Sequence, residues 1–195
     1  LFSSFFISIY LIFAYINFKY IYYLILLIYF LIFIEIYLYF KLLKFFSFFY
    51  LCISFIFFIT IDFNKIIFLN FNLFILIVIS FDIFSYIIGK NFGKNNFSSI
   101  SPNKTYEGLF GGALTSVFLS LLFAHIFEIS ISIELIFYIF LIILSSFIGD
   151  IIESFFKRKN NLKNSSEFIP GHGGVFDRFD SFLFSIIIYS ISINT

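Results

Sequence analysis

Charged residues are scarce in this chain, and their scarcity is its most restrictive property. Only 12% of the 195 residues are Asp, Glu, Lys or Arg, whereas 62% are hydrophobic. A soluble globular domain has about 25% charged residues and about 45–50% apolar ones. The composition therefore excludes an ordinary soluble domain and predicts an integral membrane protein.

The chain also has only one cysteine and no tryptophan. The single Cys52 lies in an apolar run, which excludes a disulfide framework and favours a buried, inert thiol. The chain has no Trp but 37 Phe, a bias that we attribute to AT-rich codons, so the aromatic runs are interpreted as lipid-facing rather than as a cofactor site. The formal net charge of +1 comes from local clusters and gives no indication of nucleic-acid binding.

The alternation of apolar and polar residues that transmembrane strands require is also absent. Instead, the apolar runs are continuous and about 17–23 residues long, which is the length that a helix needs to cross about 30 Å of hydrocarbon. The sequence predicts an all-α, polytopic transmembrane bundle of about seven spans, with roughly six to eight allowed. The expected spans are 1–18, 20–40, 45–61, 66–88, 107–127, 129–149 and 176–193.

Composition divides the chain into two parts. Residues 1–81 are expected to be generic transmembrane helices, and because the chain opens on Leu1 rather than Met, a truncated start is one interpretation. Residues 82–195 are expected to form a catalytic transmembrane region, since they contain both long polar loops, 89–106 and 150–175.

Lys and Arg are distributed unevenly between the two ends of these spans. Ten lie in or beside the junctions after the second, fourth and sixth spans, whereas only Lys19 and Lys65 lie on the opposite side. Cytoplasmic loops carry the excess of Lys and Arg in membrane proteins. Both polar loops are therefore expected on the cytoplasmic side of a bacterial-type inner membrane, facing one another.

The second polar loop is the most highly charged part of the chain. Residues 154–180 hold five of the twelve Lys and Arg residues, and such charge beside membrane spans is costly unless it contacts water and a polar ligand. Asp150, Glu153, Ser154 and Lys157 are spaced i, i+3, i+4 and i+7, which places them on one face of a continuing helix. Such a face can bind a cation and attract an anion, although an ordinary helix-end ion pair is the alternative.

A glycine-rich turn, PGHGG at 170–174, follows this helical face. Its backbone amides can approach an anion closely, and His172 can donate a hydrogen bond or a proton near neutral pH. Asp177, Arg178 and Asp180 then open the last helix. Asp180 is interpreted as a helix cap or dipole partner, whereas Asp177 beside Arg178 at a membrane boundary indicates a function.

The first polar loop is compatible with the same chemistry. Its last residues lead into the span 107–127, and Lys104 and Thr105 are placed to hold a phosphate at the helix N-terminus. The spacing of Gly108 and Gly112 in the same span indicates close helix packing rather than chemistry.

Two carboxylates lie well inside expected spans, Asp82 and Glu35. A carboxylate within lipid costs about 2.5–3.5 kcal/mol on insertion scales, so it is a functional candidate by default. Asp82 lies near the first polar loop and is retained as a candidate. Glu35 is considered peripheral, and no role is assigned to it.

The stretch from Ser154 to Asp180 resembles the signature of phosphatidate cytidylyltransferases, also called CDP-diacylglycerol synthases. In that signature a Ser, two basic residues and Lys-Asp precede His-Gly-Gly, Asp-Arg and a final Asp. Residues 82–108 are similar to a second conserved region of the same family, so that the resemblance covers about 82–193. The matching signature residues are Ser154, Lys157, Arg158, Lys163, Ser166, Ile169, Pro170, His172, Gly173, Gly174, Asp177, Arg178 and Asp180.

The resemblance implies transfer of a cytidylyl group from CTP to phosphatidic acid, giving CDP-diacylglycerol and pyrophosphate in phospholipid biosynthesis. Two anions must meet in this reaction, so Mg²⁺, with a second metal ion as an option, and basic side chains must offset their charge. The expected metal ligands are Asp150, Asp177 and, with less weight, Asp82. The expected catalytic residues are Asp150, Asp177, Lys163, His172 and Arg178, and the expected substrate contacts are Ser101, Lys104, Thr105, Glu107, Ser154, Lys157, Arg158, Gly173 and Gly174.

The expected partners are CTP, phosphatidic acid and the lipid bilayer, without nucleic acid and with a homodimer left open. One departure from the family pattern is Asn164, which stands where the family has Asp and predicts weaker metal binding or a lower rate. Two other classes stay open. A membrane lipid or polyprenol kinase would need a general base near its alcohol acceptor, and a transporter would need more polar residues inside its spans; an inactive relative is the third option.

Overall fold

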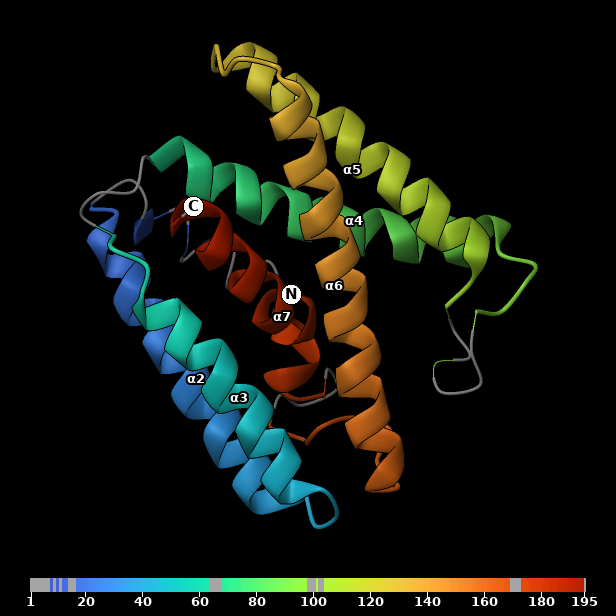
Figure 1. Ribbon diagram of the computed structural model, residues 1–195. Coiled ribbons are helices and arrows are strands. Elements are labelled where there is room, and N and C mark those ends of the chain that lie inside the picture. Colours follow the sequence, from blue (N-terminus) through green and yellow to red (C-terminus); the bar gives the residue numbers. More distant parts are fainter. Residues whose placement is uncertain are drawn as a thin grey trace.

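The computed structural model describes residues 8, 10, 12, 13, 17–63, 68–97, 101, 104–168 and 173–194, which are helical apart from their connections and one isolated bridge between Asn96 and Thr105. The helices labelled in Figure 1 are α2 (Lys19–Tyr39), α3 (Lys44–Ile59), α4 (Phe68–Phe92), α5 (Tyr106–Ile126), α6 (Ile133–Lys159) and α7 (Phe176–Asn194). This confirms the all-α fold class.

Four of these helices, α2, α4, α5 and α6, are long and apolar enough to cross a membrane. Helix α3 is equally apolar but has only 16 residues. The helix bounds agree with six of the expected spans, except that α6 continues about ten residues beyond 149 to Lys159. The expected first span, 1–18, falls largely outside the described residues, so the count of about seven spans is not confirmed.

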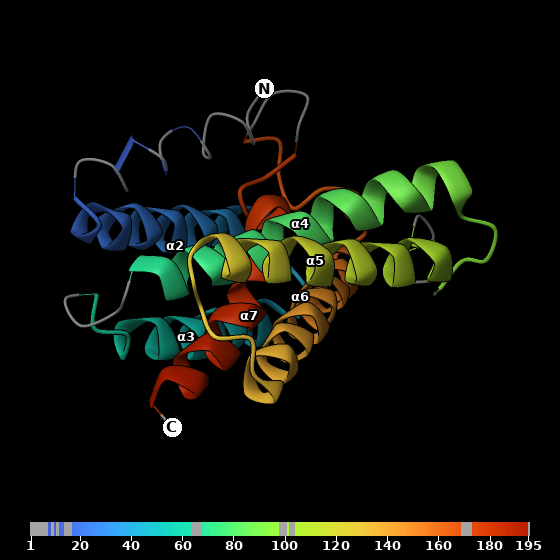
Figure 2. The same ribbon diagram turned by 90° about the horizontal axis from the view of Figure 1, so that it is seen from above.

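The helices form two pairs with α6 and α7 between them (Figure 1). Helices α2 and α3 run side by side, as do α4 and α5, and both arrangements are visible again in Figure 2. Helix α7 lies in the centre, where it contacts α3, α4 and α6. The C-terminal helix is therefore surrounded by the rest of the bundle.

Glycine spacing explains the close contact of α4 and α5. A Cβ atom on Gly112 would lie 2.7 Å from Ser85 Cβ, and one on Gly108 would lie 2.6 Å from the Ser85 carbonyl oxygen. Only glycine permits this approach of the two backbones, as is common between membrane helices. The predicted packing role of these two glycines is confirmed.

The core is apolar and aromatic. Phe74 of α4 stacks on Tyr189 of α7 with ring centroids 4.6 Å apart, and the fully buried Phe71 packs against the same tyrosine. Aromatic pairs of this kind add about 0.5–1.5 kcal/mol to their area burial. Cys52 on α3 is exposed, so the expectation of a buried thiol was wrong: the residue lies on the outer side of a peripheral helix, among side chains that face lipid.

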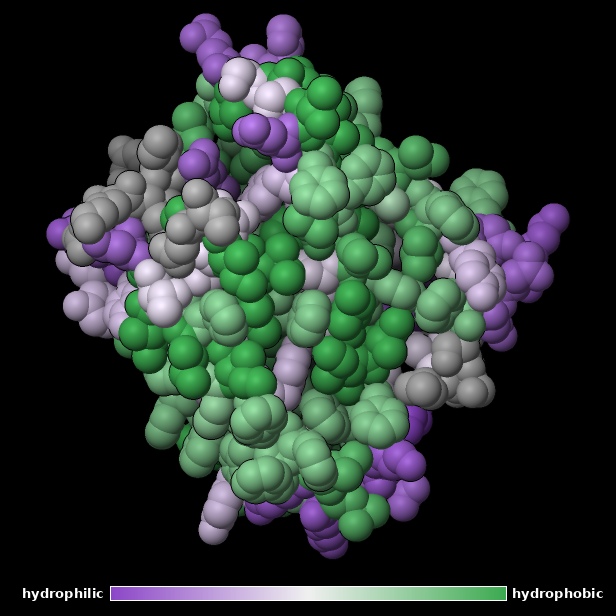
Figure 3. All heavy atoms as spheres, viewed as in Figure 1, coloured by the Kyte–Doolittle hydropathy of each residue, from purple (hydrophilic) through white to green (hydrophobic). Residues whose placement is uncertain are grey.

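The junctions after α2 and α4 each contact α6. Asn160, which ends α6, accepts hydrogen bonds of 2.7 Å from the backbone N–H groups of Lys41 and Leu42 in the α2–α3 junction. Lys104, just before α5, forms an ion pair with Asp150 of α6. Hydrophobic side chains cover most of the face in Figure 3, with hydrophilic residues at its margins, as expected for a protein embedded in lipid.

Candidate active site

A cavity of about 810 Å³ opens where the polar loops meet the helices α2, α4, α6 and α7. Most of the predicted site residues line this one cavity, although they come from widely separated parts of the chain. Asp150 and Asp177, whose proximity was the central expectation, are both among them. The polar lining residues include Asp82, Ser101, Lys104, Thr105, Asp150, Ser154, Lys157, Arg158, Lys163, Asn164, Asp177, Arg178, Asp180 and Ser181.

One wall of the cavity is apolar. Helix α2 contributes Ile21, Leu24, Ile25 and Ile28, and α4 contributes Phe71, Ile75 and Ile79. Binding sites commonly combine such hydrophobic walls with a few convergent polar groups. This cavity can therefore receive a molecule with a charged head and an apolar body.

Three carboxylates form a cluster, which we call the acidic trio: Asp150, Glu153 and Asp180. Asp150 and Asp180 line the polar end of the cavity, whereas Glu153 is fully buried behind its wall. One oxygen from each residue lies within 4.8 Å of the other two. The trio arises because Gly149 lets α6 approach α7 closely: a Cβ on Gly149 would lie 2.5 Å from the Asp180 carbonyl oxygen. Asp150, one residue further on, is thereby brought beside Asp180.

The acidic trio fits a divalent cation. Three adjacent carboxylates repel one another, and hard cations such as Mg²⁺ prefer oxygen ligands. Glu153 is fully buried, and apart from the Lys157 ammonium group its carboxylate oxygens have no hydrogen-bond donor among the described residues. A buried carboxylate without hydrogen bonds needs positive charge nearby. The donor set therefore suits a metal ion.

Lys157 supplies part of that positive charge. Its Nζ lies 2.8 Å from Oε2 of Glu153, one turn earlier on α6, and 2.6 Å from Oδ1 of Asp177 on α7. The side chain is only 14% exposed, so water screens the two ion pairs weakly. Lys157 thus links the acidic trio to Asp177.

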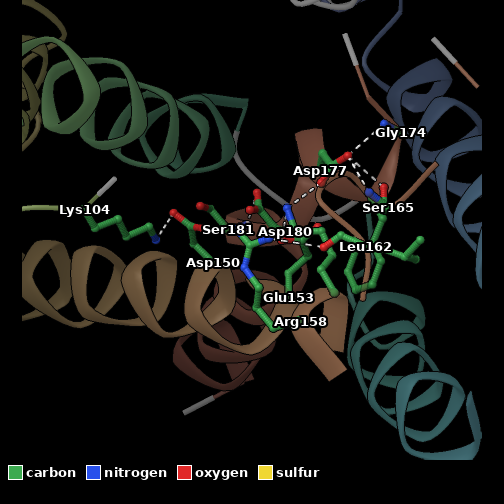
Figure 4. A network of polar contacts seen from close by, with 12 residues as sticks. Lys104, Asp150, Glu153, Arg158, Leu162, Ser165, Gly174, Asp177, Asp180 and Ser181 are labelled. Atoms are coloured by element: carbon green, nitrogen blue, oxygen red, sulfur yellow. Dashed lines mark hydrogen bonds and ion pairs between the residues drawn. The ribbon is translucent and has the colours of Figure 1, made fainter. Parts of the chain in front are cut away.

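Asp177 is held by several hydrogen bonds (Figure 4). Its Oδ2 accepts bonds from the backbone N–H of Ser165 at 2.9 Å, from the Ser165 hydroxyl at 3.0 Å and from the Gly174 N–H at 2.8 Å. The carboxylate therefore ties the start of α7 to the loop after α6. Together with the Lys157 ion pair on Oδ1, these contacts occupy both oxygens of Asp177. The role of Asp177 as a metal ligand stays a prediction.

The two polar loops meet at Lys104 and Asp150, which point toward each other in Figure 4. On the other side of the trio, the Ser181 hydroxyl donates a 2.9 Å hydrogen bond to Asp82 of α4. Asp82, which was given less weight from sequence, therefore lies beside the trio and not in it.

Some predicted substrate contacts have structural partners instead. The Thr105 hydroxyl caps α5 by accepting a hydrogen bond from Gly108 N–H, and Glu107 accepts bonds from the backbone and side-chain nitrogens of Asn95. Gly173 has a φ of +83°. Ser154 is buried at the cavity wall, whereas Lys163, Arg158 and Arg178 are exposed at its rim. His172 lies outside the described residues.

Sequence reasoning gave no role to two members of the trio. Glu153 had been placed on the same helix face as Asp150 and Lys157, so spacing was the signal that could have identified it. Asp180 had been interpreted as a cap because acids are common at helix starts. The rotation of α7 toward α6, which depends on Gly149, gives it a different position.

An apolar helical bundle with carboxylates and cationic side chains around one cavity defines a polytopic membrane protein with a charged site. The chain belongs to the cytidylyltransferase family, whose family model matches residues 1–195.

Among curated relatives, the phosphatidate cytidylyltransferase of Staphylococcus epidermidis is 43% identical over 119 residues, which are 60% of this chain and 45% of that protein. The corresponding proteins of Bacillus subtilis and Staphylococcus aureus are each 39% identical, over 116 and 118 residues. These matches cover 56% and 60% of this chain and 41% and 45% of those proteins. The chain thus spans less than half the length of the curated relatives that it matches.

Proposed function

We propose that this protein transfers a cytidylyl group from CTP to phosphatidic acid. A phosphate oxygen of phosphatidic acid forms a bond to the α-phosphorus of CTP, and the bond from that phosphorus to the β-phosphate oxygen breaks. The products are CDP-diacylglycerol and pyrophosphate. The observation that carries the proposal is a single cavity that combines two carboxylates of the acidic trio, Asp150 and Asp180, with cationic side chains and an apolar wall.

The acidic trio is the proposed site for Mg²⁺, with a second ion left open. When bound, the metal would offset negative charge on the reacting phosphates. Asp150, Glu153 and Asp180 would hold it through carboxylate oxygens. The hydrogen bonds of Asp177 favour a different task for that residue, which is to hold Lys157 in place.

The basic residues of the cavity are the proposed phosphate contacts. Arg158, Lys163 and Arg178 line its rim, and Lys157 lies deeper beside the trio. Arg can bind phosphate with two parallel hydrogen bonds, whereas Lys acts as a point charge. Lys104 would contact nucleotide phosphate or pyrophosphate from the opposite loop. The attacking phosphate oxygen is already ionised, so no strong general base is needed.

The apolar wall between α2 and α4 is the proposed location of the lipid tails. Its side chains would bury acyl groups while the phosphate head remains at the polar end. We also propose that this end faces the cytoplasm, because ten of the twelve Lys and Arg residues lie in or beside the junctions after α2, α4 and α6. A reporter fused after Lys163 that is found outside the cell would overturn this orientation.

The test is incorporation of label from CTP into a chloroform-soluble product in the presence of phosphatidic acid and Mg²⁺. Asp177→Ala should reduce the rate by about 100-fold or more, because displacement of Lys157 by even about 1 Å can cost that much. Glu134→Gln, an exposed acid in the first turn of α6, is the matched control and should retain the parent rate. Absence of label with folded parent protein would remove the enzymatic proposal.

A further inference from the structure

Glu35 is a charged residue in an unfavourable place. It lies in α2, within a membrane span, and is 0% exposed. A carboxylate at such a position is costly unless its hydrogen-bonding needs are met and it serves a purpose. The sequence indicated none, yet the structure gives both oxygens specific partners.

The partners of Glu35 come from the distant end of the chain. Its Oε1 accepts a 2.9 Å hydrogen bond from the Ser165 hydroxyl, and its Oε2 accepts one of 2.8 Å from the backbone N–H of Phe176. Phe176 is the first residue of α7, and N–H groups in the first turn of a helix have no partner inside the helix. Glu35 thus caps α7 from another helix, and its negative charge interacts favourably with the positive N-terminal end of the α7 dipole.

The same contacts lead directly to the cavity. Ser165 donates its backbone N–H to Asp177, and its single hydroxyl hydrogen is shared between Glu35 Oε1 and Asp177 Oδ2. Asp177 in turn pairs with Lys157, which pairs with Glu153 of the acidic trio. Figure 4 shows Ser165 and Gly174 directed at Asp177, with Glu153 close by.

The glycine pair of the signature gives independent support. A Cβ on Gly174 would collide with Glu35 Oε1 and with the Ser165 hydroxyl, and a Cβ on Gly173 would lie 2.6 Å from Asp177 Oδ2. These glycines therefore make room for the two carboxylates.

We propose that Glu35 is a positioning residue for the cytidylyl-transfer site. From inside α2 it fixes the start of α7 and the loop at Ser165, and through them it holds Asp177 and Lys157 in their working arrangement. The expected effect of Glu35 on cytidylyl transfer rests on the proposed function. The anchoring of α7 and Ser165 by Glu35 does not. It also gives the generic N-terminal part of the chain a role in the site.

The first test compares Glu35→Leu with Glu35→Gln in the CTP incorporation assay. Leu removes both acceptors, so kcat should fall about 10- to 100-fold, because small displacements of positioned groups have effects of this size. KM for CTP should change less than about 3-fold, since the phosphate contacts at the cavity rim remain in place. Gln can accept from Phe176 and donate to the Ser165 hydroxyl, so it should retain at least about a third of the parent kcat.

A control on the same helix separates positioning from general stability. Tyr29 is buried in α2, and its hydroxyl contacts Ser54, which donates to the Leu183 carbonyl of α7. Tyr29→Phe loses a comparable interior contact that does not reach the cavity. It should therefore lower the thermal midpoint while kcat stays at the parent value, and an equal loss of kcat in Tyr29→Phe and Glu35→Leu would overturn the proposal.

A double variant tests the route through Asp177. In an Asp177→Ala background the positioned carboxylate is already gone, so adding Glu35→Leu should lower kcat by less than about 3-fold. A full multiplicative loss would show that Glu35 acts elsewhere.

Hydrogen–deuterium exchange of the detergent-solubilised protein tests the anchoring without any activity. Glu35→Leu should speed exchange in residues 161–168 and 173–178 at least about 10-fold relative to α5, because Phe176 N–H loses its acceptor and Asp177, the acceptor of the Ser165 and Gly174 N–H groups, is no longer held in place. Unchanged exchange would overturn the positioning role. If the parent protein incorporates no label, the proposed function fails, and the exchange result still decides the anchoring.

Discussion

Replacing Lys157 by Met should destabilise this protein more than any ordinary surface substitution. Lys157 Nζ is 2.8 Å from Glu153 and 2.6 Å from Asp177, whose side chains are 0% and 12% exposed. Removing one partner of a buried ion pair costs about 3–5 kcal/mol, because the other charge is left without compensation. Asp177 keeps its hydrogen bonds to Ser165 and Gly174, so most of this cost is assigned to Glu153.

The expected loss can be measured as a thermal shift in detergent with EDTA present. For a chain of this length each kcal/mol corresponds to roughly 2–4 °C, so the midpoint should fall by roughly 6–20 °C. Lys159→Met is the matched control: it removes an exposed Lys two residues further along α6 and should change stability by about 0.5 kcal/mol or less.

The decisive variant is the double change Lys157→Met with Glu153→Gln. Because a neutral amide no longer needs a cation, the double variant should recover most of the midpoint lost by Lys157→Met. A double variant as unstable as the single one would refute the assignment of the cost to an uncompensated Glu153.

Three further changes test other parts of the site. Asp180→Asn should raise the Mg²⁺ concentration needed for half-maximal thermal stabilisation by about 10-fold or more, whereas the remote Glu134→Gln should leave it unchanged; equal Mg²⁺ dependence in both would exclude Asp180 as a ligand. Gly174→Ala should cost about 1–3 kcal/mol because its methyl group meets Glu35 and Ser165. Gly89→Ala would bring its methyl group no closer than 3.1 Å to the Thr105 hydroxyl and should cost less, so equal thermal shifts would contradict this account. Asn164→Asp, which restores the family residue, should increase the rate at limiting Mg²⁺ up to about 10-fold, and an unchanged rate would make that carboxylate dispensable.

Much of the fold could be predicted from the sequence because lipid restricts the choices. Continuous apolar runs of helix length predicted α2 to α7 within a few residues, apart from the extension of α6. That extension was itself indicated by the spacing of Asp150, Glu153 and Lys157 on one face. The distribution of Lys and Arg predicts that the polar loops share the cytoplasmic side, and this sidedness stays a prediction; Asn160 and Lys104 join the α2–α3 and α4–α5 junctions to different positions on α6.

The detailed partners within the site could not be predicted in the same way. Asp177 and Asp180 are three residues apart at the start of one helix and both contact α6, and spacing alone does not say which of them joins Asp150 and Glu153. The choice depends on helix rotation, set here by the approach of Gly149 to the Asp180 backbone. Glu35 is separated from Ser165 and Phe176 by 130 and 141 residues, so no local pattern links them.

The central claim is that this cavity transfers the cytidylyl group, including the α-phosphate of CTP, to a lipid phosphate. The most direct test supplies phosphatidic acid and Mg²⁺ with CTP labelled either at the α- or at the γ-phosphate, and follows each label into chloroform. The account predicts α-label in the lipid product and γ-label in water-soluble pyrophosphate. Transfer of γ-label to the lipid would instead identify a kinase and contradict the account.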